Sequence, residues 1–116
     1  MCIILEKSEE NAKHDGKIIQ SPLLSDLQDK NKVYQKVINN IYNDFAIDYR
    51  AVWIKDDIAL TYVKYALKIN RFKSKTVYSK VVPVKKLFSN QEINLIKKFC
   101  KNFKLDFGEL DILRDR

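Results

Sequence analysis

Residues 102–116 read NFKLDFGELDILRDR, and most of this stretch alternates apolar with polar side chains. The alternation runs through four apolar residues and three acids: Leu105, Phe107, Leu110 and Ile112, and Asp106, Glu109 and Asp111. A period of two residues is typical of a strand with one buried face. Gly108 allows a break in the pleat of that strand. We therefore expect the chain to be organised around a half-buried strand here.

Asp111 lies between Leu110 and Ile112 in this predicted strand. A carboxylate among apolar neighbours is costly to desolvate unless it faces a solvated cleft or a cation. We therefore expect Asp111 to have a partner, and a metal ion is the partner that we favour.

The length and composition of the chain favour one cytoplasmic domain. With 116 residues, of which 46% are hydrophobic, residues 1–116 can bury one core of ordinary size. No apolar run is long enough to span a bilayer, so we expect no membrane partner. Cys2 and Cys100 are too isolated for a disulfide framework or a metal motif, which favours a reducing compartment.

The charge of the chain does not decide between function classes. The formal net charge is +7, from 22 Lys and Arg against 15 Asp and Glu. Such an excess suits nucleic acid or the phosphates of a nucleotide. The acids are interspersed with the basic residues, however, so a solvated face of a lysine-rich protein explains the same composition.

The first residues predict a hairpin with a polar flap. Residues 2–5 and 17–19 form short apolar runs, and residues 8–16, SEENAKHDG, separate them with loop formers. Lys7 at the end of the first strand is placed to meet phosphate oxygens. The alternative is that Lys7 is an edge-strand residue in water.

Two segments follow whose pattern is weak. Residues 23–30 have leucines spaced for one or two helical turns. In residues 32–41, the spacing of Val33, Val37 and Ile41 fits a helix face, whereas the cluster of Val33, Tyr34, Val37 and Ile38 also fits a strand.

The remaining residues predict an antiparallel sheet covered by one helix. Residues 46–67 alternate in two runs around a polar turn at 55–57, which predicts a hairpin with Arg50 on the face opposite Tyr49. Residues 76–84 predict a further strand that leaves the sheet at Pro83. Ser89 and Glu92 form a capping box. The helix that it opens has apolar residues at steps of three and four: Ile93, Ile96, Phe99, Cys100 and Phe103. The fold class that we expect is α+β, an antiparallel sheet of hairpins with a packed C-terminal helix.

Five stretches, in chain order, carry a resemblance to a known family. They are LEKSEENAKHDG (5–16), VYQKVI (33–38), DYR (48–50), LFS (87–89) with the helix that follows it, and LDFGELDILRD (105–115). Together they resemble the C-terminal ATP-binding part of ATP-grasp enzymes, most closely the teichuronopeptide-biosynthesis type, with some similarity to the glutamate-adding ligases around DYR. The resemblance implies an ATP-dependent carboxylate–amine (or thiol) ligase that acts through an acyl phosphate, with ATP and Mg²⁺ as cofactors.

The resemblance also implies a role for individual residues. Lys7 matches the lysine that holds the ATP phosphates, and residues 8–16 match the flap above them. The usual flap is rich in glycine, so this one would rely on backbone amides and on Ser8, Asn11 and His14. Five residues match the family's hinge strand, whose backbone hydrogen-bonds to the edge of the adenine base: Tyr34, Gln35, Lys36, Val37 and Ile38. This match favours a strand over a helix for that segment.

Two residues match the phosphate end of the family's site. Arg50 matches a strand arginine that faces the phosphate or acyl-phosphate group, and Asp111 matches the first magnesium-binding carboxylate. Family members take further magnesium ligands from an acid-x-Asn pattern on the next strand, which this sequence does not reach. We therefore expect a truncated domain, incomplete at both ends, whose activity as a short chain is in doubt.

Two other function classes fit parts of the sequence. Aromatic residues interleaved with basic ones are typical of a platform for single-stranded nucleic acid. The residues concerned are Tyr62, Tyr65, Phe72 and Tyr78, with Lys64, Lys68, Arg71 and Lys75. Alternatively, the chain is a non-catalytic remnant that forms a homo-oligomer through an open sheet edge. The sequence names no carboxylate or amine substrate.

Overall fold

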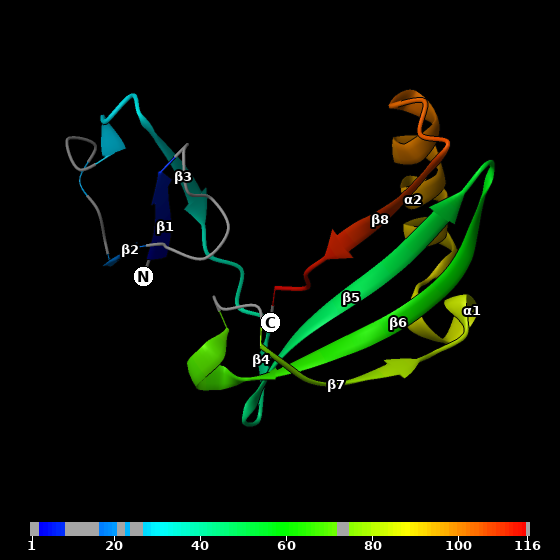
Figure 1. Cartoon of the computed structure of the whole chain (residues 1–116), viewed down its shortest axis with the longest axis horizontal. Coiled ribbons are helices and arrows are strands. Elements are labelled where there is room, and N and C mark those ends of the chain that lie inside the picture. Colours follow the sequence, from blue (N-terminus) through cyan, green and yellow to red (C-terminus); the bar gives the residue numbers. More distant parts are fainter. Residues whose placement is uncertain (1–2, 9–16, 21–22, 24–26, 72–74, 116) are drawn as a thin grey trace.

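The computed structural model describes residues 3–8, 17–20, 23, 27–71 and 75–115, and of residues 3–8, 17 and 18 the backbone alone. Its strands form two antiparallel sheets, one of three strands and one of five, and a helix covers the larger sheet (Figure 1). The predicted α+β class is therefore confirmed. In chain order the elements are β1 (Ile3–Ser8), β2 (Lys17–Gln20), β3 (Lys32–Lys36), β4 (Ile41–Tyr42), β5 (Phe45–Ile54), β6 (Asp57–Leu67), the 3-10 helix η2 (Lys68–Asn70), β7 (Thr76–Val81), α1 (Val84–Leu87), α2 (Asn90–Asn102) and β8 (Phe107–Ile112).

The smaller sheet contains the N-terminal hairpin. β1 is its central strand, with β2 on one side and β3 on the other, both antiparallel to it. The predicted first hairpin is thus confirmed. The ambiguous segment forms a strand at residues 32–36, whereas Val37 and Ile38 follow that strand instead of belonging to it. Part of the short helix predicted for residues 23–30 lies outside the described residues, and the described residues 28–30 are not helical.

The larger sheet is built on β5, which is paired along both of its edges. β6 pairs with one edge, as the predicted hairpin requires, and β7 pairs with the far side of β6. β4 and β8 share the other edge of β5, one at each end. The predicted strand at residues 76–84 ends at Val81, because Pro83 precedes α1 and cannot donate a ladder hydrogen bond.

The core lies between β5 and α2. Tyr49, Ala51 and Trp53 alternate along β5 and point to the same face, where Ile96 and Cys100 of α2 pack against them. The Trp53 indole N–H donates to the carbonyl of Leu105, at 2.9 Å, in the connection from α2 to β8. A buried indole thus fixes the turn that leads into the last strand.

Three aromatic residues with a predicted core-facing period lie at the surface instead. Phe99 and Phe103 are exposed because the inner face of α2 is taken by Ile96 and Cys100. Phe107 is 79% exposed. Its register partner is Ile54, and the pairing of β5 with β8 continues without interruption, so the break that Gly108 would allow does not occur. Because side chains alternate without a break along β8, Phe107 lies on the face of the larger sheet that is turned away from α2.

The predicted capping box is confirmed at the start of α2. The Ser89 hydroxyl accepts from the backbone N–H of Glu92 at 3.2 Å, and a Glu92 carboxylate oxygen accepts from the backbone N–H of Ser89 at 2.9 Å. Arg114, which follows β8, donates to the same carboxylate at 3.1 Å. Chiefly through the Ser89 backbone N–H, these contacts lower the pKa of Glu92.

The substitution Glu92→Gln is expected to reduce stability at neutral pH but not in acid. Because the folded pKa of Glu92 is lowered, its contribution is fully present above the unfolded pKa of about 4.3 and is lost as pH falls through the folded pKa. The difference should stay below about 1 kcal/mol, since water screens the partly exposed pair with Arg114. Urea unfolding at pH 7 and at about pH 3 measures it. A difference as large in acid as at pH 7 would contradict the assignment, and Asp106→Asn is the control.

Candidate functional site

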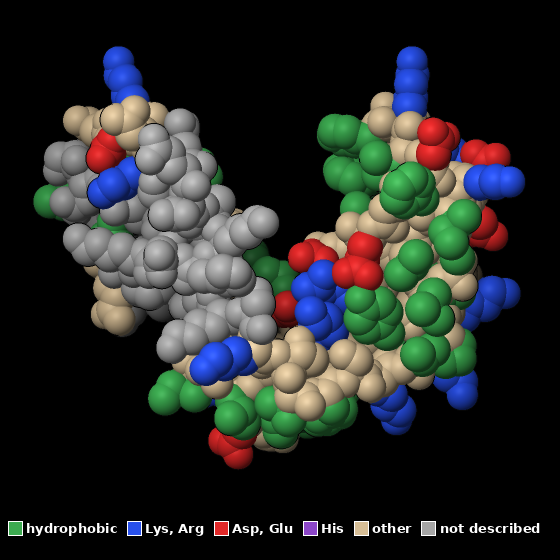
Figure 2. All heavy atoms as spheres, viewed as in Figure 1, with side chains coloured by type: hydrophobic (Ala, Val, Ile, Leu, Met, Phe, Trp, Pro, Cys, Tyr) green, Lys and Arg blue, Asp and Glu red, His purple; other side chains and the backbone are tan. Residues whose placement is uncertain are grey.

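Charged side chains gather on the face of the larger sheet that is turned away from α2. Arg50 pairs in register with Tyr62 on β6 and with Asp111 on β8, and Asp48 pairs with Lys64. Because paired residues share a face, these side chains lie together. With Glu109, they form what we call the Arg50 cluster: Asp48, Arg50, Tyr62, Lys64, Glu109 and Asp111. Figure 2 shows acidic and basic side chains gathered in the hollowed middle of this view.

Arg50 is the centre of the cluster. Its Nη1 atom donates to Glu109 Oε1 at 2.7 Å and also contacts Asp111 Oδ1. Its Nη2 atom lies 3.9 Å from an oxygen of Asp48. The expected partner of Asp111 is therefore a cation of the chain itself, whereas a metal at Asp111 stays a prediction.

Glu109 has a second contact that the sequence did not reveal. The Tyr62 hydroxyl donates to Glu109 Oε2 at 2.6 Å. This hydrogen bond is the main reason why the pKa of Glu109 is lowered, and it raises the pKa of Tyr62. Tyr62 and Glu109 are 47 positions apart, and only the order of the strands brings them together.

Asp48 connects the cluster to the segment that follows β3. The side-chain amide of Asn40, which is buried, donates to Asp48 Oδ1 at 3.0 Å and to the carbonyl of Ile47 at 3.2 Å. Burial is the main reason why the pKa of Asp48 is raised. The backbone N–H of the neighbouring Asn39 donates to Asp115 Oδ1 at 2.8 Å.

A hollow of about 570 Å³ adjoins the same segment. This volume lies in the range of small-molecule sites. Basic side chains from β3, from η2 and from the residue that follows η2 contribute to its wall, and Arg71 Nη2 also donates to the carbonyl of Ile38 at 3.3 Å. The lining residues are Lys36, Val37, Asn39, Ile41, Lys68, Arg71 and Asp115.

The structure brings some of the predicted site residues together. Arg50 and Asp111 are in contact, and Lys36 and Val37 line the hollow. Tyr34 and Gln35 lie in β3, and the Tyr34 hydroxyl accepts from the backbone N–H of Asp29 at 3.3 Å.

The N-terminal site residues lie apart from the Arg50 cluster in the fold. Lys7 and Ser8 are in β1, opposite Val33 and Lys32 of β3, so Lys7 belongs to the smaller sheet and Asp111 to the larger. The predicted flap residues Asn11 and His14 lie outside the described residues.

The carboxylate of Asp111 is chemically suited to supply one ligand to Mg²⁺. This side chain is 61% exposed, and Arg50 contacts its Oδ1. None of the described residues bonds its Oδ2, and a carboxylate oxygen is the ligand that Mg²⁺ prefers. Within the described part of the chain, no three acidic, histidine or cysteine side chains are arranged to hold a metal ion.

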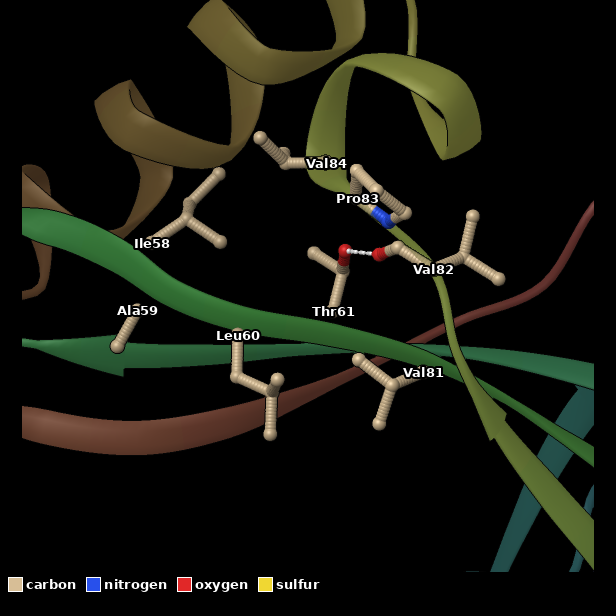
Figure 3. Close-up of a pocket in the computed structure, with 8 residues that line it drawn as sticks. All are labelled: Ile58, Ala59, Leu60, Thr61, Val81, Val82, Pro83 and Val84. Atoms are coloured by element: carbon tan, nitrogen blue, oxygen red, sulfur yellow. Dashed lines mark hydrogen bonds between the residues drawn. The ribbon is translucent and has the colours of Figure 1, made fainter.

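A second, smaller groove offers no comparable chemistry. It measures about 180 Å³ and lies where β7 leaves the edge of β6 (Figure 3). The Thr61 hydroxyl donates to the carbonyl of Val82 across it. Its wall contains no charged side chain: Ile58, Ala59, Leu60, Thr61, Val81, Val82, Pro83 and Val84. We therefore place the candidate site at the Arg50 cluster and the hollow.

Comparisons with known proteins found no relative of this chain. No protein-family model matches the chain, and neither curated proteins nor solved structures gave a match. Among the described residues, no helix has the length and apolar character needed to cross a bilayer. Function must therefore be inferred from the residues of this chain and their geometry.

Proposed function

We propose that the chain is the ATP-binding portion of a cytoplasmic ATP-dependent carboxylate–amine (or thiol) ligase that uses Mg²⁺ and an acyl phosphate. The resemblance of five stretches to ATP-grasp enzymes motivates the proposal. The observation that carries it is the contact of Asn40, two residues after the predicted hinge, with Asp48 of the Arg50 cluster. The stretches VYQKVI (33–38) and DYR (48–50), which carry part of the resemblance, are thus tied together by a residue that follows the first of them.

The hollow is suited to the base and ribose end of the nucleotide. Its wall includes Lys36 and Val37 of the predicted hinge. Lys68 and Arg71 add positive charge to the same wall, which favours the anionic ATP over a neutral ligand. The carbonyl of Ile38 is bonded to Arg71, so Arg71 fixes the backbone on which adenine recognition would depend.

The Arg50 cluster is suited to the phosphate end. Transfer of a phosphoryl group to a carboxylate brings anions together, so the site needs divalent cations and basic side chains. Among the described residues, Arg50 Nη2 has only the long contact with Asp48, so it can donate to a phosphate oxygen. Asp111 Oδ2 would supply one ligand to Mg²⁺, and the ion would offset part of the negative charge of the phosphates.

Titration with a fluorescent ATP analogue in the presence of Mg²⁺ tests the proposal. The folded chain is expected to bind the analogue below millimolar concentration. The resemblance implies that Lys7 meets the ATP phosphates from the smaller sheet, so Lys7→Ala should weaken binding roughly tenfold, because a hydrogen bond to a charged group contributes about 1.5 kcal/mol or more. Lys80→Ala, which removes an exposed lysine of β7, is the matched control. A folded chain that does not bind at millimolar analogue would refute the proposal.

Self-association is the second candidate, because none of the described residues pairs with the outer edge of β8. In a symmetric antiparallel pairing of β8 centred on Leu110, Glu109 of one copy would face Asp111 of the other. Like charges directly opposite each other are destabilising. A dimer in light scattering, at concentrations where no nucleotide binds, would favour this candidate.

The observed geometry gives less support to a nucleic-acid platform. Tyr65 and Tyr78 stack on each other with ring centroids 4.3 Å apart, and Phe45 packs edge-on to both. The Tyr62 hydroxyl is held by Glu109. Phe72 lies outside the described residues. Binding of single strands that falls steeply with salt and is indifferent to Lys7→Ala would nevertheless establish this class.

A further inference from the structure

Two acids of β8 that point to the same face differ in the use of their oxygens. Glu109 has both oxygens engaged, one by Arg50 Nη1 at 2.7 Å and the other by the Tyr62 hydroxyl at 2.6 Å. Asp111 has one oxygen in contact with Arg50, and no described residue bonds the other. The side chain of Glu109 is 38% exposed and that of Asp111 is 61% exposed.

The hydrogen bond between Tyr62 and Glu109 spans three strands. Tyr62 is on β6, Glu109 is on β8, and β5 with Arg50 lies between them. Neighbouring strands are about 4.8 Å apart, so the phenol must reach across β5 to meet the carboxylate. A carboxylate that is held at both oxygens cannot rotate freely, and its plane is therefore fixed beside Arg50.

Arg50 depends on these acids for its position. Its side chain is only 15% exposed, and its buried Nε atom has no hydrogen-bond partner among the described residues. Nη1 is therefore the anchored end of the guanidinium, and Nη2 is the end left for a ligand. An arginine that is already ordered loses less rotamer entropy when it binds an anion.

We infer that Glu109 and Tyr62 are positioning residues for the Arg50 guanidinium, whereas Asp111 is the acid of β8 that binds a cation. The inference rests on the proposed function, because a nucleotide with its Mg²⁺ is the ligand that Arg50 and Asp111 would meet. It assigns opposite roles to two acids that are two positions apart. Tyr62, which no sequence motif indicated as part of the site, acts on the ligand only through Glu109 and Arg50.

Affinity for the fluorescent ATP analogue, measured with Mg²⁺ and with a chelator, separates the two roles. Asp111→Asn is expected to remove the gain in affinity that Mg²⁺ gives. Glu109→Gln should weaken binding roughly tenfold and Tyr62→Phe about threefold, each by the same factor with and without Mg²⁺. Asp57→Asn, which removes an acid paired with Lys97 outside the cluster, should change neither quantity. A loss of the Mg²⁺ effect in Glu109→Gln would overturn the assignment.

A double variant tests whether Tyr62 works through Glu109. If it does, Tyr62→Phe should cost little further affinity once Glu109→Gln is present, because the contact that it supports is already lost. A general loss of structure would add to the effect of Glu109→Gln instead. Additive losses would therefore refute the positioning role.

A measurement without nucleotide distinguishes failure of this inference from failure of the proposed function. Nitrogen NMR of the Arg50 guanidinium should show faster exchange of its Nη1 hydrogens with water in Tyr62→Phe than in the unsubstituted chain, because Glu109 is then held at one oxygen only. Asp57→Asn should leave this exchange rate unchanged. If the chain binds no nucleotide but the faster exchange is seen, the proposed function fails and the contact stands. If the faster exchange is absent, the positioning role fails whatever the chain binds.

Discussion

Replacement of Trp53 with alanine is expected to lower the free energy of unfolding by about 3–5 kcal/mol. Trp53 is 1% exposed and is the largest fully buried side chain among the described residues. The substitution removes its apolar contacts with the core, leaves a cavity, and deprives the Leu105 carbonyl of its indole donor. A loss of this size is a large share of the stability of a small domain, which is about 5–15 kcal/mol.

Chemical denaturation of Trp53→Ala and Trp53→Phe separates the two causes. Phenylalanine keeps much of the apolar volume but cannot donate to Leu105, so we expect Trp53→Phe to cost less than Trp53→Ala. Leu95→Ala serves as a control, since Leu95 is an exposed residue of α2 and its loss leaves no cavity. If Trp53→Ala were no more destabilising than Leu95→Ala, the core between β5 and α2 would be wrongly described.

Replacement of Arg50 with alanine is expected to have the largest effect on ligand binding. Under the proposed function, Arg50 donates to phosphate oxygens and balances Glu109 and Asp111. A hydrogen bond to a charged group contributes about 1.5–3 kcal/mol, so affinity for the Mg²⁺-bound ATP analogue should fall roughly 10- to 150-fold. The change also leaves neighbouring acids without their cation, so affinity should fall in chelator as well.

Arg50→Lys is the matched variant for this prediction. Lysine keeps the charge but has one ammonium group in place of the planar guanidinium, so it cannot contact Glu109 and present a second nitrogen to the ligand in the same geometry. We expect an affinity between those of the unsubstituted chain and Arg50→Ala. Circular dichroism shows whether each variant is folded. A folded Arg50→Ala that binds the analogue normally would remove Arg50 from the site.

The parts of the fold that were predictable depend on residues close together in sequence. The hairpin β1–β2 follows from two short apolar runs around a polar loop, and the hairpin β5–β6 follows from two alternating runs around a polar turn. The start of α2 follows from the capping box. The strand at residues 32–36 needed more than periodicity, because its apolar spacing fits both a helix and a strand. Only the resemblance favoured the strand there.

The parts that were not predictable depend on which strands become neighbours. The sequence indicated Arg50 and Asp111 separately, but their contact requires β8 to pair with β5. The same pairing brings Glu109 to Tyr62, and no local pattern indicates that contact. The outward position of Phe107 has the same origin, because an uninterrupted register decides which face an alternating strand presents.

The pairing of β5 along both edges has a consequence for synthesis of the chain on the ribosome. The hairpin of β5 and β6 can close as soon as its residues emerge, whereas β8 supplies contacts such as that between Arg50 and Glu109, which are 59 positions apart. Until β8 arrives, one side of the nascent hairpin offers unpaired peptide groups to other chains. Pairing between strands that are distant in sequence is slow, and a chain in which β8 has not yet paired with β5 is prone to aggregate. Translation speed and chaperone supply should therefore govern how much of this protein is recovered folded.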